Sequence, residues 1–334
     1  METERLSPPA GFVSQGAIEL RPHETAVNLG VPLSAEHIAS LGHHITRSRQ
    51  ASLNAIPHRK SLSGVPMPEF HPDLVADEDH LTMAQMFDWS EFRNPKIWRS
   101  GIHELFLMAI YVLVSCGVTV WAIRVGGPVV SLDVGLGVFV VLTMFIMSSA
   151  SVSGAHFNPI ITWTAVGTRL CSVPRAIIYL FAHVIGAMLG GAMLRVCCGH
   201  VVTEATKLGG WGFNPELVTT GQAFCLEFFF SWSYVWITWG CGIDPKQQKV
   251  FGPVVGPICV GLALGGNIYV SGGLNDGYGG VGANPAKFFG IAVATNNFQA
   301  HWIPWMAPLL AAICQSIIYW VAPPHHEAEK PKKD

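Results

Sequence analysis

Six long apolar runs constrain this chain more than any other feature. They span 103–122, 134–152, 175–195, 219–241, 251–271 and 300–321. Each is close to the ~20 residues with which a helix crosses a hydrocarbon core of about 30 Å. Between residues 101 and 320 the chain has only 15 Asp, Glu, Lys and Arg residues, too few to solvate a globular body of that length. We therefore expect an all-α membrane protein with six transmembrane helices.

Two shorter apolar pieces, 158–168 and 284–295, are too short to cross a bilayer. We expect them to be re-entrant half-helices. Glu104 precedes Asn158 by 54 residues and Glu227 precedes Asn284 by 57, so the chain repeats itself. Because each half holds three spans, the second half enters the membrane from the opposite face. This arrangement is an inverted 3+3 repeat, and interrupted segments at matching places in the halves indicate where a solute binds.

Composition divides the chain into three parts. Residues 1–97 are rich in Pro, Ser, His and mixed charges and are expected to form a disordered cytoplasmic tail. Residues 98–322 form the membrane domain, with repeats at about 98–200 and 215–322, and residues 323–334 form a second cytoplasmic tail. The basic residues support this orientation, since ten fall on one side of the predicted spans and three on the other. The ten are Arg93, Lys96, Arg99, Arg169, Arg175, Lys246, Lys249, Lys330, Lys332 and Lys333, and the three are Arg124, Arg195 and Lys207.

The two half-helices begin with similar motifs, SGAHFNPI at 153–160 and GVGANPAK at 280–287. In each, Asn is placed to cap a helix and Pro occupies the first helical position. If the half-helices meet end to end, their positive dipole ends and two Asn amides converge on one point that repels cations. Asn-Pro also occurs at 94–95 and 214–215, where we interpret it as a turn.

The paired motifs, the repeated glutamates and the six-span hydropathy resemble the major intrinsic protein family of aquaporins and aquaglyceroporins, over about residues 98–322. The tracts WGCGIDPKQQKVFGPVVGP and SGGLNDGYGGVGANPAKFFG are similar to those of the uncategorised X intrinsic proteins of plants and fungi. The resemblance implies a pore in each subunit of a homotetramer. The plasma membrane is the default expectation for its location. The expected solutes are glycerol, urea, hydrogen peroxide or metalloid acids, the passage of water is left open, and ions and protons are expected to be excluded. It implies no enzyme activity, cofactor or metal. The implied motif residues are Asn158, Pro159, Ile160, Asn284, Pro285 and Ala286.

The resemblance also implies an outer constriction that selects the solute. Counting from the two motifs places Val138, Gly266, Val281 and Lys287 there, with Asn267 as the alternative to Gly266. The chain departs from the family pattern twice: Ile160 replaces Ala in the first motif, and Lys287 replaces Arg after the second. Because Lys is a flexible point charge and Arg a planar fork of donors, we expect weaker discrimination among neutral solutes.

Three further residues carry expected roles. The resemblance assigns Glu104 and Glu227 to holding the half-helix loops, and the alternative is a carboxylate that reaches the membrane interface. His156, two residues before Asn158, is either a pH-dependent gate or an ordinary buried histidine.

Other functions are weighed against the channel. The main alternative is a non-conducting membrane scaffold with the pore occluded at Lys287. An intramembrane enzyme would need paired acid and base groups or metal ligands near the midplane, and none is in register. The net charge of −2 gives no basic surface for nucleic acid.

Overall fold

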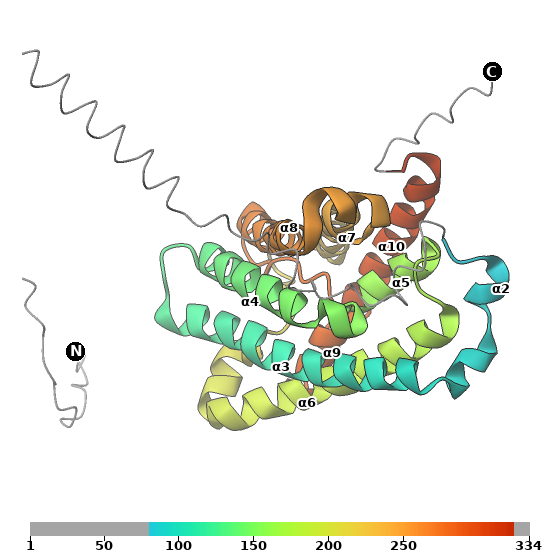
Figure 1. Cartoon of the computed structure of the whole chain (residues 1–334). Coiled ribbons are helices and arrows are strands. Elements are labelled where there is room, and N and C mark those ends of the chain that lie inside the picture. Colours follow the sequence, from blue (N-terminus) through green and yellow to red (C-terminus); the bar gives the residue numbers. More distant parts are fainter. Residues whose placement is uncertain (1–79, 324–334) are drawn as a thin grey trace, which may run out of the picture. The chain divides into compact units, whose positions relative to one another are not determined.

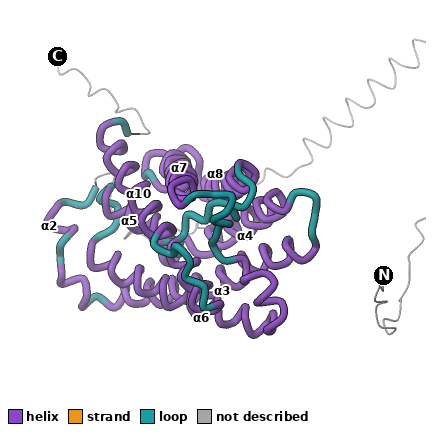
Figure 2. Tube along the Cα trace, turned by 180° about the vertical axis from the view of Figure 1, so that it is seen from behind, coloured by secondary structure: helices purple, strands orange, loops and turns teal. Residues whose placement is uncertain are grey.

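The computed structural model describes residues 80–323, and its regular elements are helical (Figure 1, Figure 2). Six helices have at least 19 residues and follow the six predicted runs in order. They are α3 (Pro95–Val125), α4 (Val130–Ser153), α6 (Val173–Thr206), α7 (Thr220–Thr238), α8 (Pro245–Leu274) and α10 (Ile303–Val321). The predicted all-helical membrane fold is confirmed.

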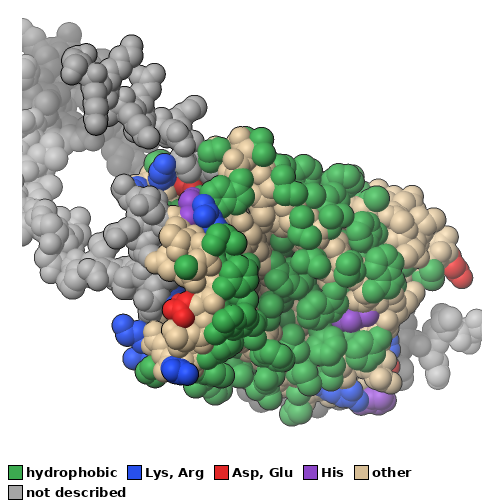
Figure 3. Space-filling view, turned by 90° about the vertical axis from the view of Figure 1, so that its right-hand side faces the viewer, with side chains coloured by type: hydrophobic (Ala, Val, Ile, Leu, Met, Phe, Trp, Pro, Cys, Tyr) green, Lys and Arg blue, Asp and Glu red, His purple; other side chains and the backbone are tan. Residues whose placement is uncertain are grey.

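Five of these helices are long and apolar enough to cross a membrane by length and composition: α3, α4, α6, α8 and α10. Helix α7 is not among them; its sequence, TGQAFCLEFFFSWSYVWIT, carries Gln222, Glu227 and several hydroxyl and indole groups. Hydrophobic side chains nevertheless cover most of the face shown in Figure 3, with charged groups toward its margins. Such a surface is suited to lipid rather than water.

Two short helices match the predicted half-helices closely. Helix α5 (Pro159–Gly167) begins after Asn158, and helix α9 (Pro285–Thr295) begins after Asn284. Each Asn has extended backbone and accepts a hydrogen bond from the first turn of its own helix, as an N-cap does. Each Pro takes the first helical position, where its missing N–H costs nothing.

The halves interlock through these short helices. Helix α5 packs against α10 of the second half, and α9 packs against α6 of the first. Helices α4 and α8 are also in close contact, because Gly135 and Gly265 face each other. A methyl group at Gly135 would lie 2.5 Å from the Gly265 carbonyl oxygen, so the two backbones approach at a distance that only glycine permits.

Several local features differ from the sequence prediction. Residues 80–97, expected in the tail, include helix α2 (Met83–Met86), the short helix η2 (Trp89–Arg93) and the start of α3. Asn94 and Pro95 begin α3 instead of forming a turn, and the Asn94 Oδ1 atom accepts from the Lys96 N–H at 3.0 Å. The remainder of the predicted tail, residues 1–79, lies outside the described residues, as do residues 324–334.

The ends of three helices are also irregular. Left-handed backbone at Gly199 interrupts α6 and at Gly252 interrupts α8. Helix α6 is followed by a short helix, η3 (Lys207–Gly209), and helix α7 runs into a π-helical turn, η4 (Trp239–Ile243). A π-turn inside a helical run is rare and often lies at a functional site.

Candidate functional site

The ends of the two half-helices meet through reciprocal hydrogen bonds. Asn158 Nδ2 donates to the Ala283 carbonyl oxygen at 2.8 Å, and Asn284 Nδ2 donates to the Phe157 carbonyl oxygen at 3.1 Å. Each motif asparagine is therefore bonded to the residue before the other. Because an amide carries two N–H donors, a second donor on each side chain is left for a solute. The positive ends of α5 and α9 face the same point.

The residue before each asparagine has left-handed backbone. The φ angle is 25° at Phe157 and 47° at Ala283, a region that residues with a side chain rarely adopt. This conformation occurs at the two carbonyls that accept the reciprocal bonds. Strain of this kind persists only where surrounding contacts fix it, and it clusters at functional sites.

In the first half, buried Glu104 holds the loop that precedes α5. Its two carboxylate oxygens are divided between two backbone donors: His156 N–H reaches Oε1 at 3.0 Å and Phe157 N–H reaches Oε2 at 2.5 Å. Each oxygen also has a side-chain partner, Ser153 Oγ on Oε1 at 2.5 Å and His183 Nε2 on Oε2 at 2.9 Å. The side chain is 0% exposed, so a full set of partners is needed to offset the burial of its charge.

In the second half, buried Glu227 holds the loop that precedes α9. Its Oε1 atom accepts from Ala283 N–H at 2.8 Å, and the Gly282 N–H is 3.3 Å from both oxygens. Its Oε2 atom accepts from Trp211 Nε1 and from the Tyr278 hydroxyl, each at 2.9 Å. Both glutamates thus face the loops rather than a membrane interface.

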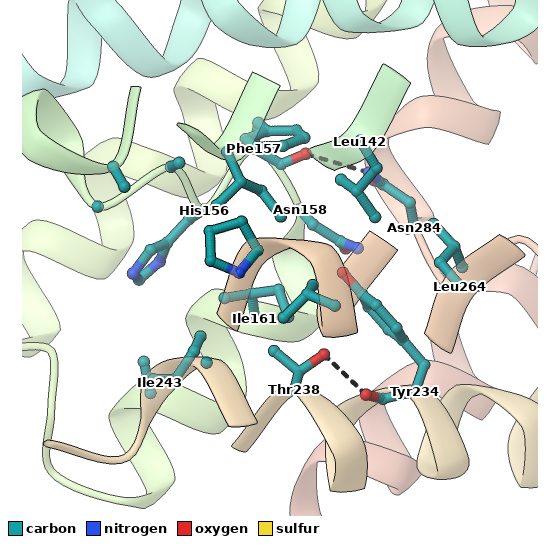
Figure 4. A pocket seen from close by; sticks show the side chains of 18 of the residues that line it. Leu142, His156, Phe157, Asn158, Ile161, Tyr234, Thr238, Ile243, Leu264 and Asn284 are labelled. Atoms are coloured by element: carbon teal, nitrogen blue, oxygen red, sulfur yellow. Dashed lines mark hydrogen bonds between the residues drawn. The ribbon is translucent and has the colours of Figure 1, made fainter. Parts of the chain in front are cut away.

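Two cavities lie on opposite sides of this meeting point. The inner cavity, of about 70 Å³, includes Asn158 and Asn284 in its lining together with Leu142 and Leu264 (Figure 4). The outer cavity, of about 270 Å³, is lined by residues that include Lys287 and Val281. Each exceeds the ~15 Å³ that one water molecule needs. The arrangement suits a small solute that moves between two chambers past the asparagine pair.

Of the four residues predicted for the outer constriction, Val281 and Lys287 line the outer cavity. Val138 is 0% exposed and lies on α4 four residues after Val134, which lines the outer cavity, and four before Leu142, which lines the inner one. Lys287 is 5% exposed, with its Nζ atom 5.2 Å from the centre of the Phe288 ring. The ion pairs found among residues 80–323 do not include Lys287, so its charge faces the cavity uncompensated by a carboxylate.

Gly266 does not lie where counting along the sequence placed it. It is exposed, and a methyl group there would meet no atom within 4 Å. The neighbours that line the cavities on α8 are Leu264 and Ile268. Because two residues turn a helix by roughly 200°, Gly266 faces the other way. The count back from the second motif runs through the loop at 275–284 between α8 and α9, and a residue count does not specify the path of a loop.

The alternative at this position, Asn267, faces α7 instead of a cavity. Its Nδ2 atom donates to the Phe230 carbonyl oxygen at 3.0 Å, and its Oδ1 atom accepts from Ser233 Oγ at 3.4 Å. On α8, Ile268 and Gly272 line the outer cavity. The Ile268 side chain makes its part of that wall apolar and bulky.

His156 lines the inner cavity and is 4% exposed. Its Nδ1 atom is 3.0 Å from Thr162 Oγ1, and its ring packs edge-on against Tyr179 at 5.2 Å. The side chain is therefore held in place by contacts on the first half.

Four partners of the glutamates were not identified from sequence: Ser153, His183, Trp211 and Tyr278. Trp211 and Tyr278 lie in loops without helical periodicity, and His183 is one more residue of an apolar helix. His183 is 79 residues away from Glu104 in the sequence, and Tyr278 is 51 residues away from Glu227. No signal in a single sequence relates residues so far apart. Among the residues that the structure covers, no group of three or more His, Cys, Asp or Glu side chains could hold a metal ion.

Comparison with known proteins agrees with this geometry. A family model described as major intrinsic protein matches residues 91–319. The lens fiber major intrinsic protein of Oryctolagus cuniculus is 30% identical over 232 residues, which cover 69% of this chain and 82% of that protein. Aquaporin-4 of Rattus norvegicus is 29% identical over 230 residues, covering 66% of each chain. The crystal structure of the aquaglyceroporin from Plasmodium falciparum superposes with a TM-score of 0.58 at 19% identity, covering 67% of this chain and 95% of that one.

Proposed function

The chain belongs to the major intrinsic protein family, a family of non-enzymatic membrane channels for water and small neutral solutes, and on this premise we propose that it passes small uncharged polar solutes of the size of glycerol, urea or hydrogen peroxide. The observation that carries the proposal is the pair of half-helices that meet through Asn158 and Asn284 between two cavities. The free amide donors replace part of the hydration of a passing solute, while the converging positive helix ends repel cations.

Selectivity is assigned to a ring of Val138, Ile268, Val281 and Lys287. Three of these side chains are aliphatic, so the ring offers a solute one charged donor and otherwise apolar walls. A flexible ammonium group imposes less geometry than a guanidinium fork. This favours a broad range of neutral solutes over strict selection of water, as does the chain's resemblance to the uncategorised X intrinsic proteins.

Flux measurements on purified protein in liposomes test the proposal. Stopped-flow light scattering after an osmotic step gives the rates for water, glycerol and urea separately. We expect glycerol and urea entry well above that of empty liposomes, and a narrower solute range in Lys287→Arg. Rates equal to empty liposomes for every solute would favour the non-conducting scaffold.

A matched pair of substitutions on α8 tests the constriction. Ile268→Ala removes bulk from the wall of the outer cavity and is expected to speed entry of the larger solutes relative to water. Gly266→Ala adds a methyl group where no atom lies within 4 Å and is expected to leave all rates unchanged. If Gly266→Ala changed the entry rates and Ile268→Ala did not, Gly266 would be the filter residue instead of Ile268.

We further assign both termini to the cytoplasm and four chains to one assembly, in the plasma membrane. The beginning and the end of the described chain lie at the same end of the helices, since His80 Nε2 is 3.3 Å from the Tyr319 hydroxyl. Arg169 lies over the Trp320 ring at 4.4 Å, so a basic residue of the predicted cytoplasmic set is at this end too. Protease protection of tagged termini in sealed vesicles tests the orientation. Light scattering during gel filtration gives the mass of the assembly.

A further inference from the structure

Two cysteines lie where the π-turn η4 packs on α8. Cys241 belongs to η4 and Cys259 to α8, and both are partly exposed. A methyl group at Gly256 would lie 3.1 Å from the Cys241 carbonyl oxygen, so η4 rests on the turn of α8 that leads to Cys259. A methyl group at Gly242 would likewise lie 2.8 Å from Val260 Cγ2, so the residues that follow the two cysteines are also in contact. Of the six other cysteines, three provide comparisons, since Cys116 and Cys171 are buried and Cys225 is exposed.

The residues that follow the two cysteines form part of the wall of the inner cavity, and we call this part its mouth. Ile243, two residues after Cys241, lines that cavity (Figure 4). Gly242, directly after Cys241, and Val260, directly after Cys259, line it as well. Gln248 Nε2 donates to the Gly242 carbonyl oxygen at 2.9 Å and so ties the turn to the start of α8. A change in the spacing between η4 and α8 therefore changes the wall of the mouth directly.

The local backbone allows such a change. Cys241 is flanked by Gly240 and Gly242, whose lack of a side chain widens the conformations open to the turn. A disulfide has a sulfur–sulfur bond of about 2.05 Å, which is shorter than any contact between two thiols. Its formation would draw η4 toward α8.

We propose that Cys241 and Cys259 form a redox-modification site, in which a hydroperoxide oxidises the two thiols to a disulfide that narrows the mouth of the inner cavity. The narrowing rests on the proposed channel function, whereas the chemistry of the thiol pair does not. The site lies at the end of the helices assigned to the cytoplasm, where disulfides are transient and serve as regulatory switches.

The reaction balances with hydrogen peroxide as oxidant. One thiolate attacks a peroxide oxygen, the O–O bond breaks, and the departing hydroxide takes up a proton to leave water and a sulfenic acid. The second thiolate attacks the sulfenic sulfur, the S–O bond breaks, and the disulfide forms with release of a second water. Two thiols lose two electrons, and one peroxide is reduced. Because the thiolate is the reacting form, the linkage should form faster as the pH rises above neutral.

The experiment uses the full chain in liposomes, treated with hydrogen peroxide and then with an alkylating reagent. Mass spectrometry of the digested protein identifies linked and alkylated cysteines, and stopped-flow scattering measures flux on the same sample. We expect a linked Cys241–Cys259 peptide, a fall in flux, and recovery of both by a thiol reductant. Cys241→Ser and Cys259→Ser should keep their flux after peroxide, and Cys225→Ser should behave like the parent protein. Cys241→Ala and Cys259→Ala serve where a serine variant does not fold.

The outcomes separate the chemistry from the function. Full alkylation of both cysteines after peroxide, with no linked peptide, would overturn the site even if the channel conducts. A linked peptide with unchanged flux in a conducting channel would overturn the narrowing. A protein that conducts no solute before oxidation contradicts the proposed function, and the linked peptide then still decides the chemistry.

Discussion

The two halves of the molecule fix their half-helix loops with the same backbone contacts and different side chains. In each half, a buried glutamate on the first long helix accepts from the N–H groups one and two residues before the motif asparagine. Glu104 spreads these two donors over both of its oxygens, whereas Glu227 gathers them mainly on Oε1 and leaves Oε2 to Trp211 and Tyr278.

The comparison teaches which contacts the fold requires. The backbone donors are common to both halves because they set the position of each asparagine. The other partners differ: a serine and a histidine in the first half, an indole and a phenol in the second. These side chains complete the hydrogen bonding of a buried carboxylate, and any donor at the right distance can do so.

The largest expected effect comes from the motif residue that differs between the halves, Ile160 against Ala286. Both are 0% exposed. Ile160→Ala leaves a cavity beneath α5 and is expected to lower the free energy of unfolding by about 2–5 kcal/mol. Thermal unfolding in detergent measures the loss. Ile102→Ala, at an exposed site on α3, is the matched control, and an equal shift in both variants would contradict a packing role for Ile160.

The glutamates themselves give the next largest effect and the sharpest test of the comparison. Glutamine replaces one acceptor oxygen with a donor. In Glu104→Gln this donor must face a backbone N–H of the motif loop, whichever way the amide points. In Glu227→Gln it can face Trp211 and Tyr278 while the oxygen keeps the loop.

An unsatisfied buried donor costs about 1–3 kcal/mol, so both variants should unfold at lower temperature. The flux should nevertheless fall more in Glu104→Gln, because only there is the motif loop disturbed. Stopped-flow rates normalised to protein content give this ratio. Equal loss of flux in the two variants would show that the division of donors between oxygens does not matter.

A smaller effect is expected from the phenol hydroxyl, which only the second half places on its glutamate. Tyr278→Phe removes one hydrogen bond to Glu227 and leaves the two loop amides in place. The expected loss is about 1 kcal/mol of unfolding free energy, with flux retained. Tyr269→Phe, on an exposed part of α8, controls for loss of a phenol. A complete loss of flux in Tyr278→Phe would mean that the side-chain partners also set the loop.

The smallest expected effect concerns pH. His156 has no counterpart in the second motif, where Gly282 takes the same place. Its ring is hydrogen-bonded to Thr162 and lies near the positive end of α5, where an added proton is unfavourable. We therefore expect flux to stay flat between about pH 5 and pH 8. A fall at acid pH that disappears in His156→Gln would instead establish this residue as a gate.

How far the sequence reaches can be judged from particular residues. Residues 158–168 and 284–295 were predicted as half-helices because Asn and Pro mark a helix start, and α5 and α9 begin within a residue of each predicted start. Gly266 shows the limit. Its position follows from counting back from the second motif, and the loop at 275–284 lies between the two, so the count does not fix which side of α8 the residue occupies. Asn94 and Pro95 show a second limit, since the same dipeptide starts a helix or a turn depending on the residues after it.

By itself, the sequence determined that this chain is a helical membrane protein with two broken helices in inverted halves, since span length, charge depletion and helix caps are local properties. The tertiary structure alone decided which side of α8 lines the cavities, which donors complete each buried glutamate, and that η4 packs on the turn of α8 around Gly256 and Val260. Those outcomes depend on the rotation of a helix about its axis and on the path of loops between distant segments. Both are set by how whole helices pack, and no short stretch of sequence encodes them.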